Sequence, residues 1–139
     1  MKFIDTNVLI YFVDGRNQAK QSIARTVIAD AIGNPEYVMS LQVLNEFANV
    51  SLKKLGMTED EVRQYIEAFQ RMRIVFQQSG WTVRALEIRK QYGLQFYDSL
   101  LLAAAEASGC DEFWTEDLND GQTYCGIKAV NPFKTLSTP

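Results

Sequence analysis

Four acidic side chains lie where a catalytic centre could form: Asp5, Glu46, Asp98 and Asp117. The 139-residue chain has no histidine, which excludes Ser–His–Asp and Cys–His nucleophilic catalysis, histidine acid–base chemistry and HExxH zinc sites. An enzyme of this composition must rely on carboxylates, on lysine, tyrosine or cysteine, or on a bound hard cation. The chain is rich in carboxylates, so they are the first candidates.

Strands and helices are predicted to alternate along the whole chain. Short apolar runs predict strands at residues 2–5, 37–39, 74–76, 112–115 and 127–130. Apolar residues at helical spacing, with capping and glycine stop signals, predict a short helix after the first strand and helices at residues 18–32, 41–55, 58–71, 82–92 and 97–108. This alternation predicts one α/β domain over residues 1–139, a three-layer α/β/α sandwich around a largely parallel sheet.

Three of the acids follow or begin predicted elements. Asp5 ends the first strand, Asp117 comes just after the strand at residues 112–115, and Asp98 lies in the first turn of a helix. Each has a structural explanation as well, because aspartate forms turns and favours helix N-termini. However, open α/β sheets bind their ligands outside the carboxyl ends of the strands, and these acids converge on that edge.

Glu46 lies inside a predicted helix, on a face that it shares with Val43 and Val50. A charged side chain on a partly apolar face is costly without a partner. We therefore expect Glu46 to point toward the same edge of the sheet and to join the other three acids.

Carboxylates gathered in this way repel one another, by about 4 kcal/mol per close pair at an effective dielectric constant near 20. Either some of them are protonated or a divalent cation lies among them. Oxygen ligands without histidine or paired cysteine favour Mg²⁺ or Mn²⁺ over zinc. Such an ion can activate water and stabilise the leaving oxygen of a phosphodiester, which predicts a metal-dependent nuclease.

Charge and hydropathy limit the environment and the partners. The net charge of −3 argues against a protein that coats nucleic acid with a broadly basic surface, so phosphates would be held by a metal ion or a local patch. The basic candidates are Lys53, Lys54, Arg71, Arg73, Arg84, Arg89 and Lys90. No apolar run is long enough to span a membrane, and we read Cys110 and Cys125 as reduced thiols of a cytoplasmic protein, although one disulfide is compatible with the count.

Several segments together resemble the PIN-domain proteins, and most of all the VapC-type toxins of bacterial toxin–antitoxin pairs. The segments are KFIDTNVLIYFVD, QVLNEFANV, FYDSLLLAAAEASGCDEFWTEDLNDGQ and the closing VNPF. The elements D-T-N, Y-D-S-L and T-E-D-L occur in the order and spacing of the family, and the resemblance covers nearly the whole chain.

The resemblance implies a parallel-sheet α/β fold and an endoribonuclease that depends on Mg²⁺, with Mn²⁺ as a substitute. It implies that the catalytic, metal-binding quartet of the family is matched by Asp5, Glu46, Asp98 and Asp117. Polar positions that orient the site are matched by Thr6, Asn7 and Thr115, whereas the match of Asp120 is ambiguous. It further implies an RNA substrate, a homodimer and a small antitoxin protein that blocks the groove.

Other families fit the residues less well. A phosphotransferase of the haloacid-dehalogenase kind needs D-x-D after the first strand, where this chain has Asn7 as the second residue. The segment at residues 117–121 resembles a calcium loop, but its glycine comes one position early and Lys128 replaces the bidentate glutamate. Two alternatives stay open: a PIN-like binding or scaffold module without catalysis, and a DNA-directed nuclease of related fold.

Overall fold

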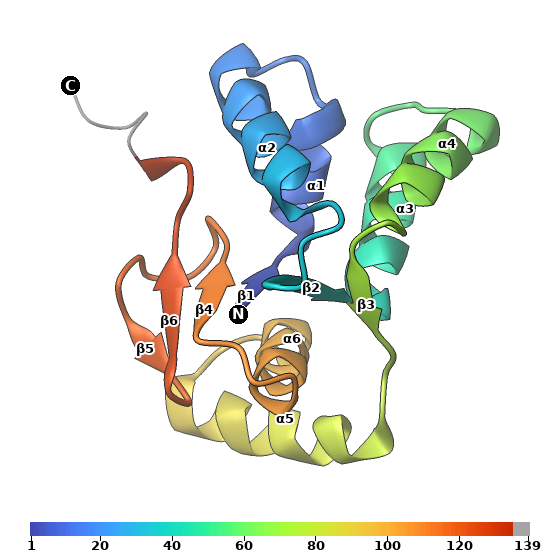
Figure 1. The fold of residues 1–139 in the computed structure, drawn as a ribbon. Helices are drawn as coiled ribbons and strands as arrows, with labels where there is room; N and C mark the ends of the chain where they lie inside the picture. Colours follow the sequence, from blue (N-terminus) through green and yellow to red (C-terminus); the bar gives the residue numbers. More distant parts are fainter. Residues whose placement is uncertain (135–139) are drawn as a thin grey trace.

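The computed structural model describes residues 1–134 and has a six-stranded sheet at its centre (Figure 1). The strand order is β3-β2-β1-β4-β6-β5. The strands are β1 (Lys2–Ile4), β2 (Tyr37–Ser40), β3 (Arg73–Val75), β4 (Glu112–Trp114), β5 (Thr123–Tyr124) and β6 (Ile127–Val130). The pairs β1–β2, β1–β4, β2–β3 and β4–β6 are parallel, and β5 alone pairs antiparallel, with β6, within the described chain. The predicted, largely parallel sheet is confirmed.

Helices cover both faces of this sheet. One layer contains α1 (Thr6–Val13), α2 (Gln18–Ala31), α3 (Leu41–Lys53) and α4 (Glu59–Phe69). The opposite layer contains α5 (Ser79–Tyr92) and α6 (Phe96–Ala107), as Figure 1 shows. The predicted three-layer α/β/α sandwich is therefore confirmed. Within the described chain, no helix combines the length and the apolar character that a bilayer crossing requires.

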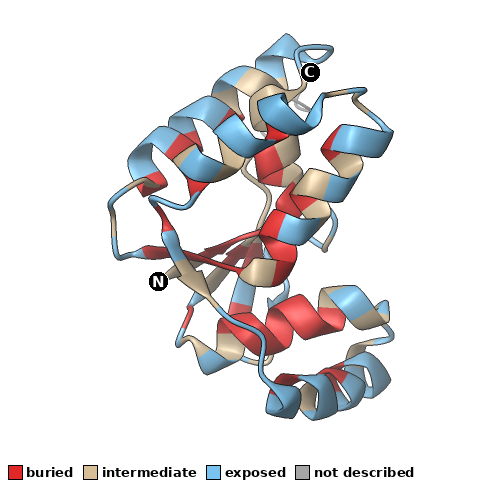
Figure 2. Cartoon of the chain, turned by 90° about the vertical axis from the view of Figure 1, so that its right-hand side faces the viewer, coloured by how far each residue is buried: buried red, intermediate tan, exposed pale blue. Residues whose placement is uncertain are grey.

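The core fixes the helix that carries Asp98. Residues 99–105 of α6 are all buried, between the sheet and the more exposed α5 (Figure 2). On the sheet, the rings of Phe3 and Phe113 stack with centroids 5.2 Å apart, which joins β1 to β4. Because α6 is held over most of its length, its first turn has a defined position at the edge of the sheet.

Two local features differ from the sequence prediction. The antiparallel β5 was not predicted, because its turn to β6 uses Cys125 at φ 52° followed by Gly126 at φ 78°. Hairpin turns of this kind usually carry Asn-Gly or Asp-Gly, so a cysteine in the left-handed region gave no signal. In addition, α5 begins at Ser79 and not at residue 82 as predicted. The prediction started the helix too late because Gly80, a poor helix former, lies inside its first turn.

Candidate active site

Asp5 lies at the junction of β1 and α1. It caps α1, and its Oδ1 accepts a hydrogen bond of 2.6 Å from the Thr6 amide. The residue is only 5% exposed, because the parallel strands and the first turn of α1 surround it. β1 ends at Ile4 and α1 begins at Thr6, so Asp5 lies between them. Aspartate is among the residues preferred at this position, the helix N-cap.

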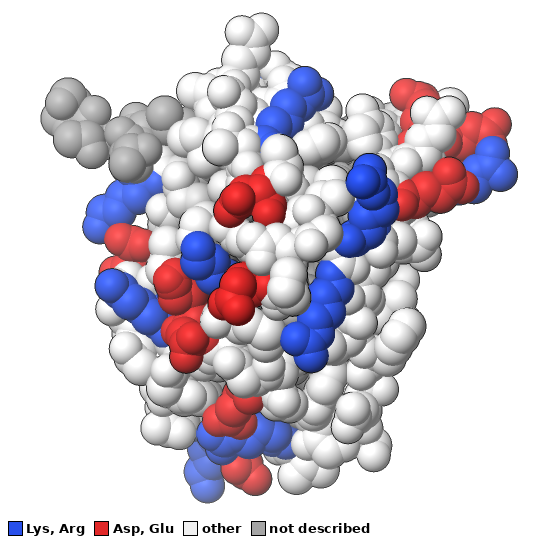
Figure 3. All heavy atoms as spheres, in the orientation of Figure 1, with Lys and Arg blue, Asp and Glu red and all other residues white. Residues whose placement is uncertain are grey.

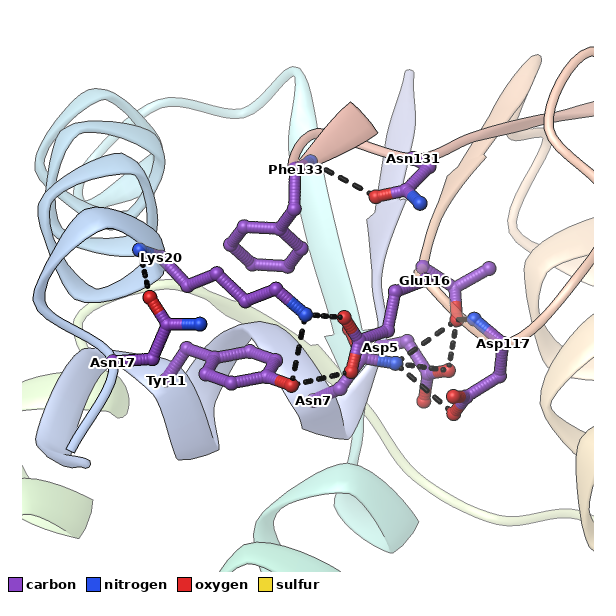
Figure 4. Close-up of polar contacts among 10 residues, drawn as sticks. Asp5, Asn7, Tyr11, Asn17, Lys20, Glu116, Asp117, Asn131 and Phe133 are labelled. Atoms are coloured by element: carbon purple, nitrogen blue, oxygen red, sulfur yellow. Dashed lines mark hydrogen bonds and ion pairs between the residues drawn. The ribbon is translucent and has the colours of Figure 1, made fainter. Parts of the chain in front are cut away.

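Asn7 connects Asp5 to Asp117, which lies more than a hundred residues away in the sequence (Figure 4). Its Nδ2 lies 3.3 Å from Asp5 Oδ2, 3.1 Å from Asp117 Oδ2 and 3.0 Å from Thr115 Oγ1. The Thr115 hydroxyl donates to Asp5 Oδ2 at 2.8 Å and accepts from the Asp117 amide at 3.0 Å. Asn7 and Thr115 therefore hold two acids from separate segments side by side.

Glu46 and Asp98 approach this pair from α3 and α6. Both line one pocket, and Glu46 Oε1 accepts a hydrogen bond of 2.8 Å from Gln42 Nε2. Burial raises the pKa of Glu46, and the charges of Asp98 and Asp117 raise it further. Burial also raises the pKa of Asp98, again with a contribution from Asp117. Asp117 thus lies close enough to raise the pKa of both Glu46 and Asp98, and Asp98 lies close enough to raise that of Glu46.

Asp5 is the most strongly affected of the four. Burial raises its pKa to about 7, although hydrogen bonds from Thr115 and Thr6 oppose the shift. The charges of Asp117 and Asp98 add to the increase. A carboxylate in this environment is stabilised when a cation neutralises it.

The donor atoms fit a hard divalent cation. Asp5, Glu46, Asp98 and Asp117 offer only oxygen, and the buried Asn7 Oδ1 and Thr6 Oγ1 have no hydrogen-bond partner within residues 1–134. In the same residues, no three His, Cys, Asp or Glu side chains are arranged to hold an ion by themselves. An open arrangement of this kind suits Mg²⁺, which keeps several waters and binds through one or two carboxylates together with substrate phosphates.

A second polar cluster, beside Asp117, was missed by the sequence analysis. Lys20 Nζ lies 2.7 Å from Glu116 Oε2 and 3.2 Å from the Tyr11 hydroxyl, which donates to Glu116 Oε1 at 2.7 Å (Figure 4). The Phe133 ring packs edge-on against Tyr11, with centroids 4.9 Å apart. These four residues, the Lys20 cluster, fasten α1, α2 and residues 131–134 to the loop that carries Asp117. The only sequence feature that could have pointed to this cluster was the position of Glu116 directly before Asp117.

Other candidates lie away from the four acids. Asp120 accepts hydrogen bonds from the Asn131 amide and from Lys134, and these contacts lower its pKa. Arg84 is engaged by Glu106 and Glu87. The guanidinium of Arg73 lies against Met1, at the end of β1 opposite Asp5.

The surface agrees with the low net charge. On the face seen in Figure 3, acidic side chains gather near the middle, and basic ones are scattered around them without forming one continuous patch.

Comparison with known proteins places this geometry in context. The PIN domain family profile matches residues 2–119. No match was found among curated protein sequences. A toxin–antitoxin complex from Klebsiella pneumoniae has a TM-score of 0.72 at 22% identity, with 95% of this chain and 98% of that chain covered.

Two further solved structures have the same fold. A VapC toxin of Mycobacterium tuberculosis, described as cleaving the sarcin–ricin loop, has a TM-score of 0.66 at 16% identity, covering 92% of this chain and 99% of its own. A VapBC pair of Rickettsia felis, bound to a DNA fragment from its promoter, has a TM-score of 0.64 at 18% identity, covering 92% and 96%.

Proposed function

This chain belongs to the PIN-domain family, and on that premise we propose that it is a Mg²⁺-dependent endoribonuclease, the toxin of a toxin–antitoxin pair. The observation that carries the proposal is the state of Asp5. It is buried, its pKa is raised to about 7, and its ionisation is coupled to Asp98 and Asp117. Asp5 also caps α1, but a cap does not account for a carboxylate whose charge is disfavoured by burial, whereas a bound cation would stabilise that charge.

In the proposed reaction, carboxylates of the set Asp5, Glu46, Asp98 and Asp117 would hold the ion together with waters and substrate phosphates. When bound, Mg²⁺ or Mn²⁺ supplies an acidified water and stabilises charge on phosphate oxygens. The chain supplies orientation: the Thr6 amide holds Asp5 Oδ1, and Asn7 sets the separation of Asp5 and Asp117. Gln42 fixes Glu46 on α3. Burial of Asp5 keeps bulk water away from the innermost carboxylate.

We propose the partners from the family and from the descriptions of the similar structures. The Klebsiella complex and the Rickettsia pair support a small antitoxin that binds this chain. The Mycobacterium toxin, described as cleaving the sarcin–ricin loop, supports an RNA substrate, and we propose a cytoplasmic location for this chain. Large exposed apolar side chains, among them Leu52, Val83 and Leu86, support a homodimer.

Two measurements test the proposed function. Purified protein should cleave RNA with Mg²⁺ or Mn²⁺ and stop when EDTA is added. Expression in bacteria should arrest growth, and co-expression of the small protein encoded beside it should restore growth. An inactive PIN-like scaffold is the alternative, and it predicts RNA binding or protein binding without any metal-dependent cleavage.

A further inference from the structure

A pocket of about 600 Å³ adjoins the acids, between α3, the segment after β3 and the start of α6. Glu46 and Asp98 form part of its wall, and Leu100 contributes an apolar side chain. Its remaining lining consists of one aromatic side chain and five amides: Tyr97, Gln42, Asn45, Asn49, Gln77 and Gln95. No Lys or Arg lines it within the described part of the chain.

Part of this amide lining is fixed and part of it is free. The buried Gln42 donates to Glu46 Oε1 at 2.8 Å and to the Tyr97 carbonyl at 3.3 Å, which sets its orientation. In contrast, the side-chain amides of Asn45, Asn49 and Gln95 are exposed and make no hydrogen bond within residues 1–134. Each offers both donors and an acceptor to a ligand.

Tyr97 gives the pocket a flat apolar surface. Tyr97 is 65% exposed, which is more than a tyrosine usually is in a folded protein. Its ring rests edge-on against Phe96, with centroids 5.3 Å apart and planes at 79°. Because Tyr97 lines the same pocket as Asp98 and Glu46, a ligand stacked on Tyr97 would lie next to these acids.

We propose that this pocket binds an unpaired nucleobase of the RNA, next to the phosphodiester that is cleaved. The inference rests on the proposed function and adds to it the form of the substrate: a strand whose base is free to leave a duplex. Proteins read such bases by stacking them on aromatic rings and by hydrogen bonding to their edges. Tyr97 supplies the stacking surface, and the free amides supply donors and acceptors.

The charges of the pocket favour a base over a phosphate. A phosphate would need cations, whereas the charged groups in the lining are the carboxylates of Glu46 and Asp98. An uncharged base edge meets amides without that repulsion, and its own phosphate falls at the acids, where the proposed ion neutralises it. The base and the scissile phosphate therefore occupy neighbouring positions.

The test measures binding with Ca²⁺ in place of Mg²⁺, by fluorescence anisotropy of a labelled single-stranded RNA and of the same RNA with abasic riboses. Electrophoresis after the measurement checks that the RNA stays intact. Wild-type protein should bind the RNA that carries bases more tightly. Tyr97→Ala should weaken that binding by about 5- to 150-fold, the range measured for one stacked base, and leave binding of the abasic RNA unchanged. Tyr97→Phe should bind as the wild type does.

A matched control is Phe76→Ala, which removes an aromatic side chain that is 67% exposed and does not line the pocket. It should keep the preference for RNA with bases. The double change Asn45→Ala with Gln95→Ala should reduce the differences in affinity among RNAs that differ in one base.

Each of the following results would overturn the inference: Tyr97→Ala binding both RNAs as wild type does, equal weakening for both RNAs, or the same loss in Phe76→Ala. The inference is also overturned if Tyr97→Ala changes the molecular mass measured by light scattering but keeps the preference for RNA with bases. Tyr97 would then face a second copy of the chain. Cleavage by the wild type separates the two ideas. If the wild type cuts RNA but binds it without regard to bases, the pocket assignment alone is wrong. If it neither cuts nor binds RNA, the proposed function is wrong and this inference falls with it.

Discussion

Lys20 forms an ion pair of 2.7 Å with Glu116, the residue immediately before Asp117. The two side chains are 27% and 22% exposed, and the Tyr11 hydroxyl bonds to both. Glu116 is thereby drawn toward α2, away from the acids around Asp5. The neighbouring Asp117 instead accepts a hydrogen bond from Asn7 in the candidate active site.

Removing Lys20 should lower the stability of the fold. Lys20→Met leaves Glu116 half-buried without its cation, which should lower the free energy of unfolding by about 1 kcal/mol, since both groups retain contact with solvent. Urea denaturation measures the change, and adding Glu116→Gln should recover part of it. The control is Arg63→Met, which breaks the exposed pair with Asp60 and should change stability very little. Equal losses in both variants would contradict a special role for Lys20.

The raised pKa of Asp5 predicts how the metal-free protein responds to pH. Burial moves this pKa from 3.8 to about 7, so between those values the folded state binds more protons than the unfolded state. Stability in EDTA should then be highest at the acidic end of this window and fall as pH rises toward 7. Thermal melting across the window measures this, and Asp5→Asn should flatten the slope. An unchanged slope in Asp5→Asn would mean that other groups cause it.

Asp98→Asn should separate an active-site acid from a structural one. It keeps the shape of the side chain and removes one of the charges that raise the pKa of Asp5 and Glu46. In EDTA the variant should be at least as stable as the wild type. With Mg²⁺ at a hundredfold excess over Kd, the wild type should gain ~2.7 kcal/mol, and Asp98→Asn should gain less. A lower melting temperature in EDTA together with an unchanged response to Mg²⁺ would identify Asp98 as structural.

The fold could be predicted because its signals are local. The Thr58–Glu61 capping box, for example, starts α4 as the sequence indicated, with both reciprocal hydrogen bonds present. The positions of Asp5 and Asp117 just after strands followed from the same local pattern. That all four are ligands of one ion stays a prediction.

Long-range relationships could not be predicted from local signals. The hydrogen bonds of Asn7 to Thr115 and Asp117 depend on β1 and β4 being neighbours, which the order of strands in the sequence does not state. Lys20 was not among the basic candidates, because its contact with Glu116 depends on how α2 packs beside the loop after β4.

The most direct test of the account is the initial rate of RNA cleavage as Mg²⁺ is added to protein stripped with EDTA. The account predicts no cleavage without metal and saturating cleavage with it. Asp5→Asn and Asp98→Asn should lower the rate by at least about 100-fold. Losing a residue that only orients a metal ligand usually costs up to about 100-fold, and losing the ligand itself should cost more. Asp120→Asn, which removes an acid paired with Lys134, should cleave as the wild type does. Undiminished cleavage in EDTA, or by Asp5→Asn, would contradict the account.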